Sequence, residues 1–519
     1  MSRYHDHPNY RWMVLGILMI GTFMAILDTS IVNVALPHMM SAFGVNRDQI
    51  EWVSTGFMLA SAVTMPLIGW LSDRFSYERL YLLSLFIFTA GSALCAFAWS
   101  YHTLVGFRVI QAIGGGAIQP VGMALVADLF EPEERGKALG IWGTGIMLGP
   151  AIGPTLGGYL TEWFNWRSIF SVNLPVGVAA LIFGMVIMNL QADRQRKRHS
   201  FDLLGYGFLS LFLITSLLAL SNGERLGWSS DYILICTALS VVGLVMFLAI
   251  ELSVQEPLLD LGLFKHRNYS ISMLLSIFRS IGLFGGVFLL PIFLQNLVGY
   301  TTIQTGLWMM PGALAVGLVM PLAGQMTDRY HPRWLVFFGI VVTGISLFMF
   351  GYLDPKSGAL MLLGPQIIRG VGLAFMMAPL MTAALNAVPR EAIATASSFL
   401  NITSRVGGAF GIAILNTFVT HMASRHALHL SEGLSRQSQT FQRLTFWLQH
   451  HAAGSLAATQ QGVMLLAGKL IAFRAQVLAF DNGFVFGGLI LLVGGIPLSL
   501  LLAHSRSSSD HREPLTVPE

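Results

Sequence analysis

The chain has 519 residues, of which 11% are charged and 54% are hydrophobic, whereas an average soluble protein is about 25% charged. So little charge cannot cover the surface of a soluble protein of this length, and the composition therefore excludes a soluble enzyme. The net charge of +4 forms no basic stripe, which argues against nucleic acid as a partner. The two cysteines, Cys95 and Cys236, lie in apolar runs and define neither a disulfide framework nor a metal site.

Long apolar stretches predict an all-α polytopic membrane protein. Roughly twenty apolar residues cross a bilayer as a helix, and stretches of that length exclude the alternating pattern of an outer-membrane barrel. In chain order we expect about fourteen spans, near residues 12–36, 51–71, 79–99, 104–127, 137–160, 168–190, 203–222, 232–251, 270–295, 304–326, 334–353, 360–386, 392–419 and 481–503.

Lys and Arg residues in the connecting segments predict the orientation, because cytoplasmic loops carry an excess of them. With the N-terminus inside, the inner segments hold seventeen Lys and Arg residues and the short outer loops hold four. Both termini are therefore expected in the cytoplasm, the C-terminal one as a tail over 504–519. The long polar segment 421–478 is expected to be an outer loop, although the count of Lys and Arg applies poorly to a segment of this length.

The sequence repeats itself at an offset of 255 residues. After the second and tenth spans the repeated residues are Gly69, Asp73 and Arg74, and Gly324, Asp328 and Arg329. Parallel repeats are typical of transporters whose substrate site lies between two halves. We therefore expect an N-terminal six-helix bundle over 1–190, linkers and two inserted transmembrane helices over 191–268, and a C-terminal six-helix bundle over 269–503.

Charged residues inside the predicted spans are the first candidates for function, because each costs on the order of 2.5 kcal/mol or more in a membrane. Asp28 and Arg108 lie at similar depths in the first and fourth spans, so we expect them to pair. The pair is either purely structural or a proton-coupling site in which Asp28 binds and releases a proton. The other intramembrane charges are Arg279, Arg369 and Arg405.

The substrate cavity should lie between the halves and be lined by polar side chains from the spans. Gln111 lies one turn deeper than Arg108, close to the level of Asp28. Our candidates for the cavity are Asn33, Gln111, Arg279 and Arg405.

The fifth span carries glycines at every fourth position, with prolines between them. Small residues at this spacing form one stripe along a helix, which allows a neighbouring helix to approach closely. We therefore expect a tight helix interface. The residues of this motif are Gly145, Gly149, Pro150, Gly153, Pro154, Gly157 and Gly158.

The chain shows no phosphate-binding loop, since neither Gly136-Lys137 nor Gly468-Lys469 completes one. ATP is therefore not expected as a ligand, and pumping would depend on an ion gradient. The histidines of segment 421–478 have no acidic or cysteine partner at ligand spacing, so no metal is expected there. Helical periodicity over 437–478 suggests either an amphipathic cap on the bundle or a docking surface.

Several motifs together resemble those of a known family. Residues 27–37, LDTSIVNVALP, resemble the first-helix signature of the fourteen-span drug:proton antiporters of the major facilitator superfamily, the EmrB/QacA type. The segment around Asp73 is similar to that superfamily's inner-loop latch, Arg108 with Gln111 to its proton-relay motif, and the fifth span to its antiporter motif. Ser76 and Ala112 stand where this family usually has glycine.

This resemblance implies a proton-coupled antiporter in a bacterial inner membrane, with Asp28 and Arg108 in proton coupling, no cofactor and no enzymatic activity. It would export hydrophobic, cationic or amphiphilic drugs by alternating access. The long outer segment resembles that of Gram-negative members, which work with a periplasmic adaptor (a membrane fusion protein) and an outer-membrane channel. The alternatives are an exporter of one metabolite, such as a siderophore or fatty acid, and a non-transporting membrane scaffold.

Overall fold

The computed structural model describes residues 7–188, 200–254, 256–355, 358–432, 443, 446 and 456–503. These residues form helices and no strand, so the predicted all-α class is confirmed. Most of the first linker and the whole of the tail over 504–519 lie outside the described residues.

The first half of the chain and the inserted hairpin consist of eleven helices. Their bounds are α1 (Tyr10–Phe43), α2 (Arg47–Ile50), α3 (Trp52–Thr64), α4 (Leu67–Arg74), α5 (Tyr77–Ala96), α6 (Tyr101–Leu129), α7 (Arg135–Trp163), α8 (Ser168–Ser171), α9 (Asn173–Ile187), α10 (Leu203–Leu226) and α11 (Asp231–Ser253).

The second half starts with a short 3-10 turn, and its first long helix is interrupted by two π-helical segments. Its elements are η1 (Leu261–Lys265), α12 (Arg267–Phe284), η2 (Gly285–Leu289), α13 (Leu290–Phe293), η3 (Leu294–Val298), α14 (Thr302–Arg329), α15 (Pro332–Phe350), α16 (Ala359–Asn386), η4 (Arg390–Ala392), α17 (Ile393–Glu432) and α19 (Leu456–Leu501).

Short polar residues explain where several helices begin. The Ser100 hydroxyl accepts a hydrogen bond from the Thr103 backbone N–H and the Thr103 hydroxyl faces back to Ser100, which forms a capping box for α6. Ser76 caps α5 in the same way through the N–H of Arg79. The serine that replaces the usual glycine of the inner-loop motif therefore has a structural role here.

Twelve of the described helical segments are long and apolar enough to cross a membrane. The bent pair formed by Arg47–Thr64 and Leu67–Arg74, with an angle of 53° at the break, is a thirteenth. The glycine-rich α7 has 29 residues and is long enough to be a fourteenth, at about 1.5 Å per residue. The chain is a multi-pass membrane protein, and the total of fourteen spans stays a prediction.

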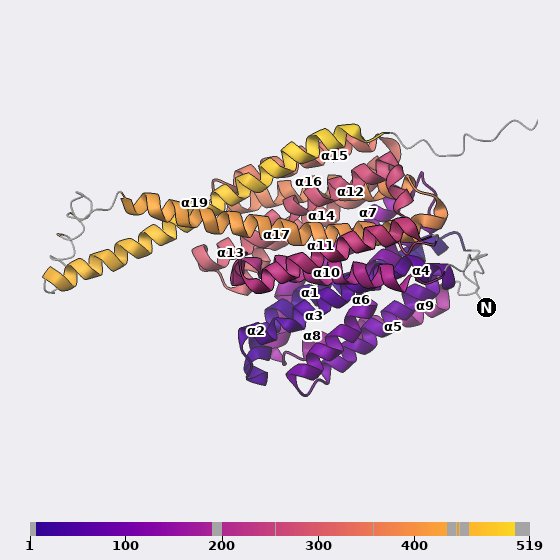
Figure 1. Cartoon of the computed structure of the whole chain (residues 1–519), viewed down its shortest axis with the longest axis horizontal. Helices are drawn as coiled ribbons and strands as arrows, with labels where there is room; N and C mark the ends of the chain where they lie inside the picture. The colour runs from indigo at the N-terminus through magenta and orange to yellow at the C-terminus, as the bar shows by residue number, and fades with distance from the viewer. Residues whose placement is uncertain are drawn as a thin grey trace, which may run out of the picture.

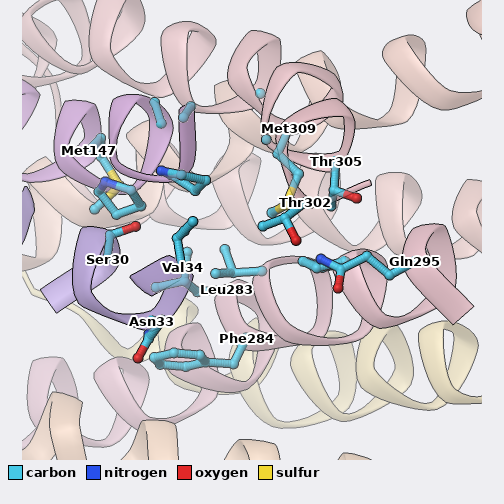
Figure 2. A pocket seen from close by; sticks show the side chains of 18 of the residues that line it. Ser30, Asn33, Val34, Met147, Leu283, Phe284, Gln295, Thr302, Thr305 and Met309 are labelled. Atoms are coloured by element: carbon cyan, nitrogen blue, oxygen red, sulfur yellow. The ribbon is translucent and has the colours of Figure 1, made fainter. Parts of the chain in front are cut away.

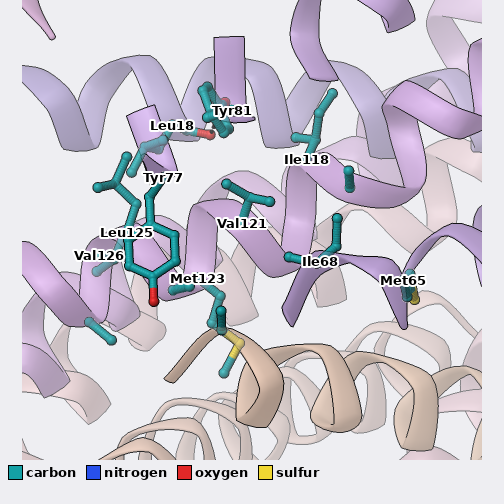
Figure 3. Packing of buried hydrophobic residues seen from close by; sticks show 14 of the residues in the cluster. Leu18, Met65, Ile68, Tyr77, Tyr81, Ile118, Val121, Met123, Leu125 and Val126 are labelled. Carbon is teal, nitrogen blue, oxygen red and sulfur yellow. Dashed lines mark hydrogen bonds between the residues drawn. The ribbon is translucent and has the colours of Figure 1, made fainter. Parts of the chain in front are cut away.

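The helices form two bundles that meet mainly along α7 and α14 (Figure 1). Helix α10 of the inserted hairpin packs against α3 of one half and α17 of the other, so the hairpin bridges both. The N-terminal bundle has its core between α1, α5 and α6, where Leu18, Tyr81 and Val121 are fully buried (Figure 3). The Tyr81 hydroxyl donates to the Leu18 carbonyl at 3.2 Å, which ties α5 to α1.

The first and last described residues lie at one end of the bundles, and we call this the inner end because the sequence predicts it to be cytoplasmic (Figure 1). Asp328 of α14 lies at the same end, because it contacts the start of α7 and Glu134 there pairs with Arg11 of α1. Helix α2 lies at the opposite, outer end.

The predicted long loop is not a loop over its described part. Helix α17 continues from its membrane-spanning part to Glu432, and α19 already begins at Leu456. Both helices run beyond the rest of the bundle at the outer end (Figure 1), so their described parts form an outward arm. Most of 437–455, the first part of the segment expected to be a cap or a docking surface, lies outside the described residues. We call the projecting parts, 427–432 and 456–473, the arm.

Candidate functional site

Asp28 lies at the centre of a buried polar cluster in the N-terminal bundle. Its Oδ2 accepts a hydrogen bond from Arg108 Nη1 at 2.6 Å, and both side chains are almost fully buried. Its Oδ1 accepts from Gln111 Nε2 at 3.0 Å and from Asn173 Nδ2 at 2.9 Å. The expected contact between Asp28 and Arg108 is therefore present, and three donors from α6 and α9 surround the carboxylate.

A second layer of contacts fixes these donors in place. The Ser92 hydroxyl of α5 accepts from Gln111 Nε2 at 2.6 Å, and the Arg108 guanidinium donates to the Gln111 side-chain oxygen at 2.7 Å. The ring of Phe57 lies under the guanidinium, with 4.1 Å between its centroid and Cζ, a favourable cation–π arrangement. The cluster therefore joins α1, α3, α5, α6 and α9.

A cavity of about 800 Å³ lies between the two halves. Figure 2 shows Ser30, Asn33 and Val34 of α1 on one side and Leu283 and Phe284 of α12 facing them. Helices α7, α14 and α16 supply most of the remaining wall, which is mainly apolar. The lining also includes the exposed residues Arg47, Gln295 and Thr302 at the outer end.

The cavity and the Asp28 cluster share the helix α1. Ser30, Asn33 and Val34 face the cavity, whereas Asp28 faces the interior of the N-terminal bundle and does not line the cavity. Asp28 precedes Ser30 by only two residues, so the two sites are separated by the width of one helix. Any movement of α1 therefore changes both.

Only one of the four predicted cavity residues lines the cavity. Asn33 does so, and its side-chain oxygen accepts from the Ser54 hydroxyl at 3.1 Å. Gln111 belongs to the Asp28 cluster instead, since its face of α6 turns into the bundle. Arg279 and Arg405 are also absent from the lining; Arg279 donates to the Ser404 hydroxyl at 2.9 Å. Those three predicted residues therefore do not line this cavity, whereas Arg369 of α16 does.

The glycines of α7 allow close packing against α1. A Cβ at Gly149 would lie 2.8 Å from Ile26 Cγ2 and 3.0 Å from the backbone N of Leu27. A Cβ at Gly153 would lie 2.5 Å from the Ser30 hydroxyl, and one at Gly157 2.8 Å from Ile31 Cγ1. The expected tight interface is present.

The other residues of the α7 motif lie around this contact. Gly145 faces Met19 of α1, and Gly158 faces Ile303 of α14. Pro150 and Pro154 line the cavity. Because α7 also runs along α14, it connects the two halves.

The inner-loop motifs of both repeats hold the halves together at the inner end. The Asp328 carboxylate accepts the backbone N–H of Gly136 at 2.7 Å and that of Lys137 at 2.9 Å, which caps the N-terminus of α7. Gly324 lies directly against Gly136. We call these contacts the inner latch. They hold α7 and α14 together at the inner end, and none of these residues lines the cavity.

The first repeat makes a related contact. Gly69 of α4 lies against Thr395 of α17, where a Cβ would be 2.7 Å from the threonine hydroxyl. The Arg74 guanidinium stacks on Trp70 with 4.1 Å between Cζ and the ring centroid. Asp73 lies in the last turn of α4, which ends at Arg74, and Arg329 is exposed at the end of α14.

Ser92 and Asn173 are parts of the Asp28 cluster that the sequence analysis missed. Both are neutral and therefore do not stand out as charges do in an apolar span. Asn173 is the first residue of α9, two positions before Pro175, and a polar amide at such a break in a span is the one signal that could have identified it. Among the described residues, no group of three His, Cys, Asp or Glu side chains is placed to hold a metal ion.

The comparisons with known proteins agree with this architecture. The family model described as Major Facilitator Superfamily matches residues 18–412. The multidrug export protein EmrB of Escherichia coli K12 is 32% identical over 483 residues, which are 90% of this chain and 93% of that protein. A multidrug resistance protein B homolog of Mycobacterium tuberculosis H37Rv is 34% identical over 410 residues, covering 78% and 76% of the two chains.

A solved structure shares the fold. The human organic anion transporter MFSD10 (TETRAN) superposes with a TM-score of 0.56, covering 93% of this chain and 99% of its own. At 15% sequence identity, this likeness concerns the fold alone.

Proposed function

We propose a function from one premise: this chain belongs to the Major Facilitator Superfamily. It is a proton-coupled antiporter that exports hydrophobic or amphiphilic compounds across a bacterial inner membrane by alternating access. The names of its relatives as multidrug export and resistance proteins support export of varied compounds over one metabolite. The observation that carries the proposal is the buried Asp28 carboxylate, which shares α1 with the cavity.

The proton site couples to the cavity through α1. In the structure Asp28 accepts three hydrogen bonds, one of them from the Arg108 guanidinium, and we assign proton uptake to a state in which Arg108 has moved away from the carboxylate. A substrate that contacts Asn33 and Val34 pushes on the opposite face of the same helix. Substrate binding and protonation of Asp28 therefore influence each other, because both depend on the position of α1.

Alternating access follows from the two ends of the cavity. The inner latch holds the two halves together at the inner end, while the exposed Arg47 and Thr302 border the cavity at the outer end. On this basis we assign the structure to a state in which the substrate leaves toward the outer end. The opposite state requires that Asp328 release α7 and that the outer helices approach each other.

The proton gradient can drive such a cycle. A proton gains about 2.3 kcal/mol per 100 mV of membrane potential and about 1.4 kcal/mol per pH unit. One proton that uses both terms sustains a substrate gradient of several hundred-fold, since every ~1.4 kcal/mol is a factor of ten. Among the described residues, the arm of α17 and α19 reaches farthest beyond the bundle, and we assign to it the contact with a periplasmic adaptor that leads to an outer-membrane channel.

The test is Asp28→Asn in the full-length protein, reconstituted in proteoliposomes with an imposed pH gradient. The amide has nearly the same shape but does not titrate, so gradient-driven accumulation of a fluorescent amphiphile should be lost. Adding the same compound to purified protein in weak buffer should release protons from the parent and none from the variant. Asp231→Asn, an exposed carboxylate at the start of α11, is the matched control and should behave as the parent does.

Arg108→Ala should abolish transport as well, because removing one partner of a buried ion pair costs about 3–5 kcal/mol. Uphill transport together with parental proton release in Asp28→Asn would place the coupling site elsewhere. Arg108→Lys keeps the charge and separates a loss of the ion pair from a loss of folding.

A further inference from the structure

Arg369 is a buried cation in the wall of the cavity. It lies in α16, its side chain lines the cavity, and only 4% of the residue is exposed. Its Nη2 donates to the Gln366 side-chain oxygen at 2.7 Å and its Nη1 to the Leu283 carbonyl at 3.3 Å. Both acceptors are neutral, and Nε has no acceptor. A guanidinium has five N–H groups and stays charged in proteins, so this one retains donors and an uncompensated positive charge.

The structure around Arg369 holds the guanidinium in place. A Cβ at Gly286 would lie 2.6 Å from Arg369 Nε, so the missing side chain at this position makes room for the guanidinium. Gly286 lies in the π-helical segment η2, where the shifted hydrogen-bond pattern of the helix leaves carbonyls without their usual partner. The Leu283 carbonyl that Arg369 contacts lies just before this segment.

Among the residues that the structure describes, no carboxylate that lines the cavity pairs with Arg369. The one acidic lining residue is Glu51, which lies near the outer end and pairs with Arg47 at 3.1 Å and with Arg225 at 3.6 Å. Asp28 faces away from the cavity and pairs with Arg108. The cavity wall also contains the apolar residues Leu283, Phe284, Val287, Val316 and Leu373.

We propose that the cavity binds amphiphiles that carry a carboxylate or a similar anionic group, and that Arg369 is the residue that receives this group. The inference rests on the proposed function, because it takes this cavity to be the transport route. A charge-assisted hydrogen bond forms between the substrate anion and the free N–H groups of Arg369. The apolar body of the substrate packs on Phe284 and Leu283. The expectation of cationic substrates from the sequence is thereby replaced by one of anionic amphiphiles.

The experiment compares three fluorescent probes with the same body and different head groups. They are 11-(dansylamino)undecanoic acid, its carboxamide, and the corresponding trimethylammonium compound. Their binding is measured on the full-length protein in phosphatidylcholine nanodiscs. We expect the parent to bind the carboxylate at least tenfold more tightly than either of the others. Equal affinities, or a preference for the ammonium compound, would overturn the proposal without any variant being needed.

Variants then assign the preference to one residue. Arg369→Gln should bind the carboxamide as the parent does and lose the tenfold preference for the carboxylate, whereas Arg369→Lys should keep part of it. Arg333→Gln removes an arginine at the inner end of the same half, outside the cavity, and should keep the full preference. If Arg369→Gln keeps the preference, the anion binds elsewhere.

Two further measurements distinguish a substrate site from a lipid site, and the role of Arg369 from that of Asp28. Repeating the comparison in phosphatidylglycerol nanodiscs should leave the preference unchanged; its loss there would show that the site holds an anionic lipid and would overturn the assignment to a substrate. Gradient-driven transport of all three probes is measured in proteoliposomes. Transport that depends on Asp28 but not on the head group would refute the role of Arg369 and leave the proposed function standing, whereas no gradient-driven transport of any probe would refute both.

Discussion

Replacing Asp328 by asparagine should weaken the inner latch and shift the protein toward the state that is open at the inner end. The carboxylate accepts two backbone N–H groups of α7, at 2.7 and 2.9 Å. A hydrogen bond to a charged group contributes about 1.5–3 kcal/mol. The amide keeps one acceptor oxygen and no charge, so we expect a loss equal to about one such bond.

That loss corresponds to a change of about 10- to 150-fold in the ratio of the two states. If the latched state accounts for ~99% of the parent, it should fall to between ~90% and ~40% in Asp328→Asn. The increase in the unlatched state is then large enough to be measured directly.

The assay is the distance distribution between spin labels at Glu133→Cys and Tyr330→Cys, two exposed positions at the inner ends of the two halves. Cys95 and Cys236 are buried and should label slowly. Asp354→Asn removes an exposed carboxylate that pairs with Arg474 and serves as the control. An unchanged distribution in Asp328→Asn would refute the inner latch as an energetic contact.

Three further predictions concern packing, the arm and topology. Gly149→Leu should impair export while leaving membrane insertion intact, because the new side chain would collide with α1. Gly16→Leu, at a glycine with open space around its Cβ position, is the control and should transport as the parent does. Full export by the Gly149 variant would remove the close-packing argument. Replacing 430–462 by a short Gly/Ser linker should leave drug binding and transport in proteoliposomes intact and abolish protection of whole cells; complete protection would mean that the arm contacts no adaptor. Topology tags at Arg196 and Arg512 should report the cytoplasm, and a tag at Gln437 should report the opposite side. A cytoplasmic signal from Gln437 would contradict the fourteen-span topology.

The spans were predictable because a membrane requires long apolar helices, and most predicted limits agree with the helices to within a few residues. Beyond the membrane this constraint ends. The polar residues from 420 to 432 continue α17 as a helix, although their composition is that of a loop, since an existing helix is extended at little cost once its nucleus has formed.

The candidate site was predictable where charge marks it and not where orientation decides. Asp28 and Arg108 stand out because a charge in a span needs a partner. Gln111 could equally have faced the cavity, since only the packing of α6 against α3 and α5 turns it toward Asp28. The sequence likewise could not predict that Arg369 lacks an acidic partner in the cavity. That depends on which other side chains line the same cavity wall.

The length of α17 has a mechanical consequence. This single helix has 40 residues and is therefore about 60 Å long. Its first turns contact the N-terminal half, where the Ser397 hydroxyl donates to the Pro120 carbonyl at 2.9 Å, and its last turns belong to the arm. A rocking motion of about 10° pivoting near Ser397 moves the far end by about 10 Å. In the proposed alternating-access cycle, the tip of α17 would therefore move outward or inward together with the change in cavity orientation.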